Sequence, residues 1–381
     1  MSLSTQERDR RYGQLRADMQ REGLDVHIVY GSSGRSGNRT GHIAYVSNFR
    51  PFSAGQQVLV FPLEGEPVLF VGVENQRIEA LRTSWLTDVR CNPRTPVLSE
   101  LCGYLKETLG AGKRIGIASL HLMPAAWYQK LQEEVPAKEW VEAGELILER
   151  RLVKSDEEIA LLRRAAELSD KMWDHLRENV REGMTELEIR TEMDRAIMPG
   201  GGTENFNMMG LASMADGGEA PWGYVIPPTD RKIKRGDAVL FEISPRVEGY
   251  WNQIVRVLCL GPAAKWLTDA YDVVRLARDE SLKHLRPGEP MVAMITATKR
   301  VIEEHGYDMW PYGLAHLTGL DLGIYPFTED TTGTLMPGMG VVVHPMFPLG
   351  PDRQLFMGET YVVTEDGYEP LNRCSDELAC L

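Results

Sequence analysis

The stretch that decides the fold is Gly236–Arg256, which reads GDAVLFEISPRVEGYWNQIVR. Asp237–Ile243 has the near-continuous apolar character of a buried strand, and Gly249-Tyr250 marks a hairpin. A second strand is predicted from Trp251 to Leu260 by its alternation of side chains. Side chains on two paired strands can converge on one point of a sheet, and Glu242 and Gln253 are the polar candidates for such a pair.

Composition places the chain among soluble globular proteins. Its 381 residues are 43% apolar and 25% charged, which is enough for two domains with cores of their own. The net charge of −13 argues against nucleic acid and anionic membranes as partners, because either would need a basic face. The sequence contains no run of 18 apolar residues, so no membrane span is predicted. Five cysteines without a CxxC motif, and a polar start unlike a signal peptide, predict free thiols and a cytoplasmic location.

The chain divides into two predicted parts near residue 150. Before it, a helix over 5–22 and short strands alternate with helices, which is typical of an α/β domain over residues 1–149. At the boundary, Ser155 and Glu158 form a capping box at the start of a helix. The second part, residues 150–381, is predicted to hold helices over 185–196, 264–285 and 290–304, and strands over 238–244, 251–260, 340–344 and 360–364.

Several motifs resemble the creatinase/aminopeptidase P/prolidase family. They are Gly236-Asp237, Gly249-Tyr250, Arg256 and Gly261 of the opening stretch, RLVKSDEEI over 151–159, MPGM over 336–339 and VTEDG over 363–367. The resemblance implies an α/β creatinase-like N-terminal domain followed by an α+β pita-bread catalytic domain. It also implies a homodimer that acts on a small-molecule substrate.

By the same resemblance, five positions match the two Asp, one His and two Glu that hold two divalent ions in the family. Here they read Glu242, Gln253, His316, His344 and Glu365. Only two carboxylates remain to offset the charge of two ions, so a dinuclear site is not expected. Two readings stay open. Either no metal is bound, which is the favoured one, or a single Zn, Fe or Mn ion lies on Glu242, His316, His344 and Glu365.

Without a metal, the catalytic residues are expected to be His316, His344, Glu365 and Glu242. A histidine held by a carboxylate titrates near neutral pH and can move a proton either way. Glu242 and Glu365, if buried together, would repel, so that one of them would stay protonated.

The expected substrate-binding residues are Gln253, Tyr224, Trp222, Phe356 and Arg50. Arg50 lies in the segment His42–Phe52, whose counterpart in creatinase-like members reaches the active site of a neighbouring subunit. For the aromatic residues, ordinary core packing is the alternative role, and for Arg50 it is an exposed loop position.

The expected function is hydrolysis of a C–N bond in a small, non-peptide substrate by His/Glu acid–base chemistry, as the resemblance to creatinase implies. Three alternatives stay open: a metal-dependent Xaa-Pro peptidase, a lyase or hydrolase with a single metal ion, and a non-catalytic pseudo-peptidase that binds a small ligand.

Overall fold

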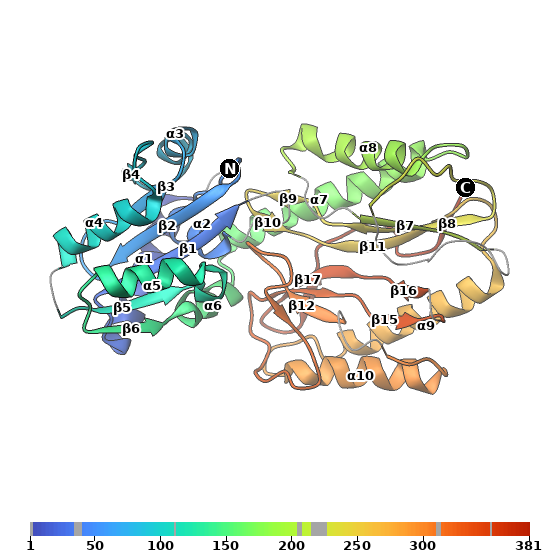
Figure 1. Cartoon of the computed structure of the whole chain (residues 1–381). Coiled ribbons are helices and arrows are strands. Elements are labelled where there is room, and N and C mark those ends of the chain that lie inside the picture. The colour runs from blue at the N-terminus through green and yellow to red at the C-terminus, as the bar shows by residue number, and fades with distance from the viewer. Residues whose placement is uncertain are drawn as a thin grey trace. The chain divides into compact units, whose positions relative to one another are not determined.

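The computed structural model describes residues 3–33, 40–109, 112–203, 208–214, 227–309, 314–350 and 353–381. The chain forms two compact units, Met1–Arg151 and Leu152–Leu381, shown from blue to red along the sequence in Figure 1. The sequence placed the boundary at residue 150. Each unit is built around its own sheets and cores, in keeping with the predicted α/β and pita-bread α+β domains.

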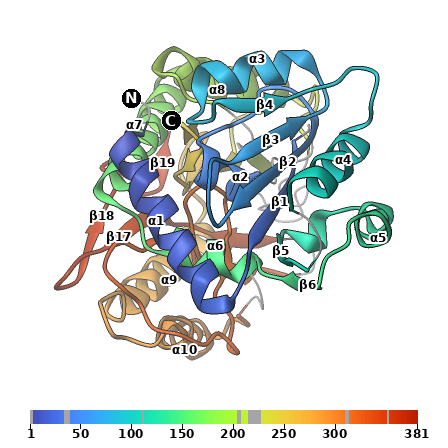
Figure 2. The ribbon, with the colours of Figure 1, turned by 90° about the vertical axis from the view of Figure 1, so that its left-hand side faces the viewer.

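The first unit is a mixed sheet with helices on both faces. Among the described residues its strand order is β4-β3-β2-β1-β5-β6, with β1 antiparallel to β2 and parallel to β5. Helix α1 lies on one face of the sheet, and α4 and α5 lie on the other (Figure 2). The elements are α1 (Thr5–Glu22), β1 (Val26–Ser33), α2 (Gly41–Ser47), β2 (Gly55–Pro62), β3 (Val68–Val71), α3 (Glu74–Thr83), β4 (Asp88–Arg90), α4 (Val97–Leu109), β5 (Arg114–Ala118), α5 (Ala125–Glu134), β6 (Glu139–Glu142) and α6 (Gly144–Leu152).

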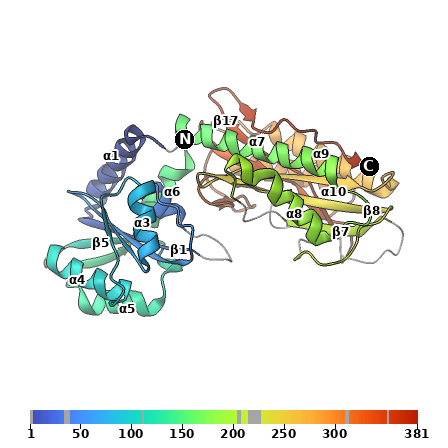
Figure 3. The same cartoon turned by 90° about the horizontal axis from the view of Figure 1, so that it is seen from above.

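The second unit holds two larger sheets, with strand orders β19-β11-β8-β7 and β13-β12-β14-β17-β18 in its described part. Helices α7 and α8 lie over the strands in the view of Figure 3, and α9 and α10 lie on the opposite side in Figure 1. The helices are α7 (Asp156–Asn179), α8 (Glu186–Ile197), α9 (Lys265–Leu282) and α10 (Met291–Glu304). The strands are β7 (Met208–Ser213), β8 (Asp237–Ile243), β9 (Arg246–Val247), β10 (Tyr250–Trp251), β11 (Ile254–Cys259), β12 (Ala315–Leu317), β13 (Tyr325–Pro326), β14 (Gly340–Val343), β15 (Met346–Pro348), β16 (Gln354–Phe356), β17 (Glu359–Val363), β18 (Tyr368–Pro370) and β19 (Ala379–Cys380).

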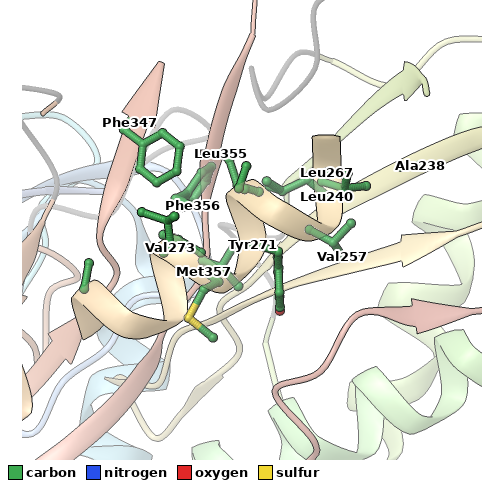
Figure 4. Close-up of a cluster of buried hydrophobic side chains, with 14 of the residues drawn as sticks. Ala238, Leu240, Val257, Leu267, Tyr271, Val273, Phe347, Leu355, Phe356 and Met357 are labelled. Carbon is green, nitrogen blue, oxygen red and sulfur yellow. The ribbon is translucent and has the colours of Figure 1, made fainter. Parts of the chain in front are cut away.

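An apolar core joins β8 and β11 to helix α9. Alternate residues of β8 and β11 face this core, among them Leu240 and Val257, and Leu267 and Tyr271 of α9 pack against them (Figure 4). Burying such side chains stabilises the fold by about 1.5–3 kcal/mol each. The core therefore fixes β8, which carries Glu242, and β11, which begins directly after Gln253.

The second predicted strand is interrupted where the sequence suggested a continuous run over 251–260. The chain forms β10, leaves the ladder at Asn252 and Gln253, and resumes as β11. The buried Asn252 side chain accepts a hydrogen bond from Ser169 at 2.6 Å and donates to Asn372 at 3.1 Å. Local alternation could not reveal these partners, because they come from distant parts of the chain.

The capping box at the start of α7 is confirmed. Ser155 accepts from the Glu158 amide at 3.3 Å, and Glu158 accepts from the Ser155 amide at 3.0 Å. The second carboxylate oxygen of Glu158 also accepts a hydrogen bond from the buried Tyr250 hydroxyl at 2.8 Å. The cap thus links the start of this helix to β10, next to Gln253.

None of the helices that the structure describes is long and apolar enough to cross a membrane.

We expect Ser155→Ala to lower the free energy of unfolding by about 1 kcal/mol, because the cap of α7 loses its acceptor. Urea unfolding measures the difference. Thr296→Ala, an exposed change within α10, is the matched control and should alter stability by less than about 0.5 kcal/mol. Equal effects of the two changes would contradict the role of the cap.

Candidate active site

The predicted convergence of Glu242 and Gln253 is confirmed. The Gln253 side-chain amide donates a hydrogen bond to Glu242, and both side chains are buried. The Gln253 backbone is held by Thr360 of β17, whose hydroxyl accepts from the Gln253 amide and donates to its carbonyl, each at 2.9 Å. Gln253 therefore stands between the two sheets, fixed at both its backbone and its side chain.

His316 continues this chain of hydrogen bonds. It lies in β12, where its Nε2 is 3.0 Å from Oε1 of Gln253 and its Nδ1 is 3.1 Å from the carbonyl oxygen of Leu317. The result is a continuous buried chain from Glu242 through Gln253 to His316, which we call the Glu–Gln–His chain.

His344 completes the cluster from the residue that follows β14. Its ring centroid is 5.1 Å from that of His316 and 6.2 Å from that of Phe356. The side chain is only 5% exposed, yet neither ring nitrogen has a hydrogen-bond partner among the described residues. Because buried polar atoms are nearly always satisfied, His344 is the group of the cluster best suited to meet a ligand.

Two protonation states satisfy the Glu–Gln–His chain. In one, Glu242 is ionised and accepts from Gln253, while His316 carries protons on both nitrogens and donates to Gln253 and to Leu317. In the other, the Gln253 amide is turned by a half-rotation. It then accepts from a protonated Glu242 and donates to Nε2 of a neutral His316, whose Nδ1–H still donates to the Leu317 carbonyl. A single proton and one amide rotation separate the two states.

Burial favours the uncharged state. It raises the pKa of Glu242 from its usual 4.5 to about 8. It lowers the pKa of His316 to about 4, and that of His344 to about 3, where the neighbouring His316 adds a second, smaller contribution. Burial thus argues against the expectation that a histidine here titrates near neutral pH, because its effect outweighs the hydrogen bond to the Leu317 carbonyl, which raises the pKa of His316. The predicted repulsion between Glu242 and Glu365 does not occur, because Glu365 is exposed; burial alone raises the pKa of Glu242.

Gly358, in the segment before β17, leaves room for His344. Its backbone forms a β-bridge with Val255 of β11, and Val255 in turn lies opposite Glu242 of β8. A Cβ atom at Gly358 would lie 2.3 Å from the Val343 carbonyl oxygen and 2.4 Å from the His344 Cβ. His344 thus occupies the space that a side chain at residue 358 would need, and glycine at this position was a signal that the sequence reading missed.

Glu365 does not belong to the cluster, which corrects the sequence prediction. It is exposed in the turn between β17 and β18, beyond the end of the strand that carries Thr360. No hydrogen bond joins it to the cluster within the described ranges. Glu359 directly precedes Thr360 and is also acidic. Its side chain is buried and pairs with Arg256 at 2.5 Å.

Of the other residues predicted to bind substrate, the structure describes Phe356 and Arg50. Phe356 is buried beside His344 and belongs to the apolar core drawn in Figure 4. Trp222 and Tyr224 lie outside the described residues. Arg50 belongs to the first unit, where it donates to the Asn48 side chain at 2.6 Å, so its proposed reach into a neighbouring subunit stays a prediction.

The residues brought together do not fit the metal centre of the family. Glu242 is the one carboxyl group that the structure places in the cluster, and Gln253 occupies it through its amide. Across the described ranges, no three His, Cys, Asp or Glu side chains come close enough to hold a metal ion. Two ions would need several carboxylates to balance their charge, and a single-ion site loses its expected fourth ligand with Glu365.

We expect Gly358→Ala to disrupt the site, because the new methyl group would push against the backbone at Val343 and against His344. The unfolding free energy should fall by about 1–3 kcal/mol, which thermal or urea unfolding measures. Gly367→Ala is the matched control, since a Cβ there meets no atom within 4 Å. A tolerated Gly358→Ala would show that His344 is not confined in this way.

Stability should fall as the pH rises from 6.5 to 8. The folded protein keeps the Glu242 proton up to about pH 8, whereas the unfolded chain loses it near pH 4.5, so raising the pH favours unfolding. The lowered pKa values of His316 and His344 act in the opposite direction, but only below about pH 6.5.

Urea unfolding at several pH values tests this linkage. We expect a loss of about 1.4 kcal/mol per pH unit in the wild type beyond that of Glu242→Gln. Glu365→Gln, a matched change at an exposed carboxylate, should keep the wild-type slope. Identical slopes for the wild type and Glu242→Gln would mean that Glu242 is not held protonated.

Comparison with known proteins places this geometry in a family. The chain matches the model of metallopeptidase family M24 over residues 160–365 and that of the creatinase/prolidase N-terminal domain over residues 11–153. A peptidase of Staphylococcus aureus whose function is uncharacterized is 29% identical over 228 residues, 59% of this chain and 64% of that protein. The chain thus spans less than two thirds of the length of the staphylococcal relatives. The Xaa-Pro dipeptidase of Pyrococcus horikoshii is 23% identical over 268 residues, 70% of this chain and 75% of that protein.

Solved structures share the fold over nearly the whole chain. An X-Pro aminopeptidase from Thermotoga maritima superposes with a TM-score of 0.85 at 17% identity, covering 97% of this chain and 99% of that one. An Xaa-Pro dipeptidase from Bacillus anthracis gives a TM-score of 0.81 at 21% identity, covering 98% and 100% of the two chains. The names of these proteins agree better with the peptidase alternative than with the expected non-peptide substrate, and they lend no support to metal-free chemistry. The chain belongs to metallopeptidase family M24, with the creatinase-type N-terminal domain and pita-bread fold of the prolidases and aminopeptidases P.

Proposed function

We propose that the chain is a hydrolase for a C–N bond of a small substrate, and that it works by proton transfer at Glu242, His316 and His344 without a dinuclear metal site. The observation that carries this proposal is the Glu–Gln–His chain. The Gln253 amide bridges Glu242 and His316, and these three residues occupy positions that the resemblance matches to metal ligands of the family. Family membership supports hydrolysis of a C–N bond, and the substituted donors support a route without two ions.

In this proposal, His344 meets the substrate. Its nitrogens have no partner in the described part of the chain, so a bound water or substrate group would satisfy them. The neutral imidazole accepts a proton from the attacking water as negative charge develops on the substrate. Phe356 lies against the same ring and limits how it turns.

In the proposed site, Glu242 and His316 hold and exchange the proton that the reaction uses. Burial keeps the proton on Glu242, and Gln253 fixes the orientation of both partners. Rotation of the Gln253 amide lets His316 take up a proton when Glu242 gives one up, so that the chain stays satisfied in both states. Glu242 gives its proton to the leaving nitrogen, and His316 takes up the proton that His344 accepted from the attacking water, so one proton leaves the cluster as another enters it.

A metal-dependent Xaa-Pro peptidase is the second candidate, and the comparisons favour it. The relatives that carry a specific name are Xaa-Pro dipeptidases and aminopeptidases. It would require metal ligands from residues outside the described ranges or a rearrangement of Gln253. The homodimer, the cytoplasmic location, and the substrate contacts of Trp222, Tyr224 and Arg50 remain further proposals.

Metal analysis together with a substrate screen tests the two candidates. Protein purified without added metal should carry well under one equivalent of Zn, Fe or Mn. Chelator-treated enzyme should keep its turnover of a guanidino, ureido or cyclic amidine compound. His344→Ala should lower kcat by about 10²–10⁴-fold, while His284→Ala, a matched change at a half-exposed histidine paired with Glu289, should leave it unchanged.

Other outcomes would replace the proposal. Two equivalents of metal with Xaa-Pro cleavage that chelator abolishes would establish the peptidase. One equivalent that is lost in His344→Ala would establish a site with a single ion. Ligand binding without turnover across both substrate classes would establish a pseudo-peptidase.

A further inference from the structure

The last eleven residues of the described chain, Leu371–Leu381, run along β11 as a C-terminal strap. Near the active site, the side chain of Asn372 in the strap is hydrogen-bonded to Asn252, the residue before Gln253. Farther along, Arg256 of β11 donates from Nε to the Ser375 carbonyl at 2.9 Å. The strap therefore follows the strand that leaves the Glu–Gln–His chain.

The strap ends as strand β19, which pairs in parallel with the far end of β11. Leu258 lies opposite Ala379, and Cys259 lies opposite Cys380. Two backbone hydrogen bonds secure this register: Leu381 donates to the Cys259 carbonyl at 2.9 Å, and Gly261 donates to the Leu381 carbonyl at 2.8 Å. Paired strands lie about 4.8 Å apart, within the range of Cα separations that a disulfide spans.

Cys259 and Cys380 are free thiols that already touch. Residues directly opposite each other in a sheet present their side chains on the same face, so the strand register places these two free thiols next to each other. Cys259 is fully buried and Cys380 is exposed. Burial and the contact with Cys380 raise the pKa of the Cys259 thiol to about 12, so the exposed partner is the one that meets an oxidant first.

We propose that Cys259 and Cys380 are a redox modification site that closes reversibly to a disulfide. The Cys380 thiolate attacks one sulfur of a low-molecular-weight disulfide such as oxidised glutathione, and one glutathione leaves as its thiolate. Cys259 then gives up its proton and attacks the Cys380 sulfur, which releases the second glutathione. Two protein thiols are oxidised, and one glutathione disulfide is reduced to two thiols.

The disulfide would lock the far end of the C-terminal strap onto β11. Closing a long loop of chain stabilises the folded state, chiefly by restricting the unfolded one. Cys374, also in the strap, is different: its sulfur lies 3.4 Å from Arg256 Nη2 and has no register partner that is a cysteine. The inference rests on strand register and does not depend on the proposed hydrolase activity.

Incubation of the full-length protein with excess oxidised glutathione tests the site. Mass spectrometry should find an intrachain link between the peptides that contain Cys259 and Cys380, with a loss of two hydrogens and no retained glutathione. Tm should rise by about 5 °C or more, and dithiothreitol should reverse both changes. Cys91→Ser, the control at a thiol of the first unit, should behave as the wild type.

The exposed position of Cys380 makes Cys380→Ser the informative variant, because it should fold normally and lose both the link and the Tm shift. A stable glutathione adduct on Cys380 with Cys259 still reduced would overturn the proposal. So would a link of either cysteine to Cys374, or a Tm shift that persists in Cys380→Ser.

Discussion

The hydrogen-bonded contact of Gln253 with Glu242 on one side and His316 on the other is the interaction on which the rest of the site depends. Three polar side chains buried at one point must satisfy one another, since each unpaired group costs about 1–3 kcal/mol. An amide is suited to the central position because it donates at one end and accepts at the other. The chain is thereby satisfied without a net charge and without an ion.

The fold brings the residues of this contact together from separate sheets. Glu242 stands on β8, His316 on β12, and the Gln253 backbone is bonded to Thr360 of β17. The bridge between Val255 and Gly358 brings the two sheets together at this level. Glycine at 358 is needed because the Val343 carbonyl oxygen and the Cα and Cβ atoms of His344 take the space where a side chain would stand.

Membership of the M24 family and the side chains of this site favour different chemistries. The scaffold is shared with prolidases and aminopeptidases P over nearly its full length, and a shared fold does not fix the reaction. The donor set bears on the reaction, and the described part of this site holds one carboxyl group, one amide and two imidazoles where the resemblance implies a carboxylate-rich set. Such a cluster favours neutral species, since burial penalises every charged form of its members.

The sequence by itself determined the capping box at Ser155, the paired strands around Gly249 and the meeting of Glu242 with Gln253, because these follow from local patterns, and its resemblance to the prolidase family determined the fold class. It also singled out His316 and His344 as partners in the site. Only the tertiary structure decided that Glu365 is exposed, that Gly358 makes room for His344, and that Asn252 and Gln253 leave the strand for distant partners. It also decided the protonation of the cluster and the contact between Cys259 and Cys380. The physical reason is that burial, desolvation and strand register depend on residues from separate elements of the chain, such as Cys259 with Cys380 and Gln253 with Thr360, which no local pattern in the sequence records.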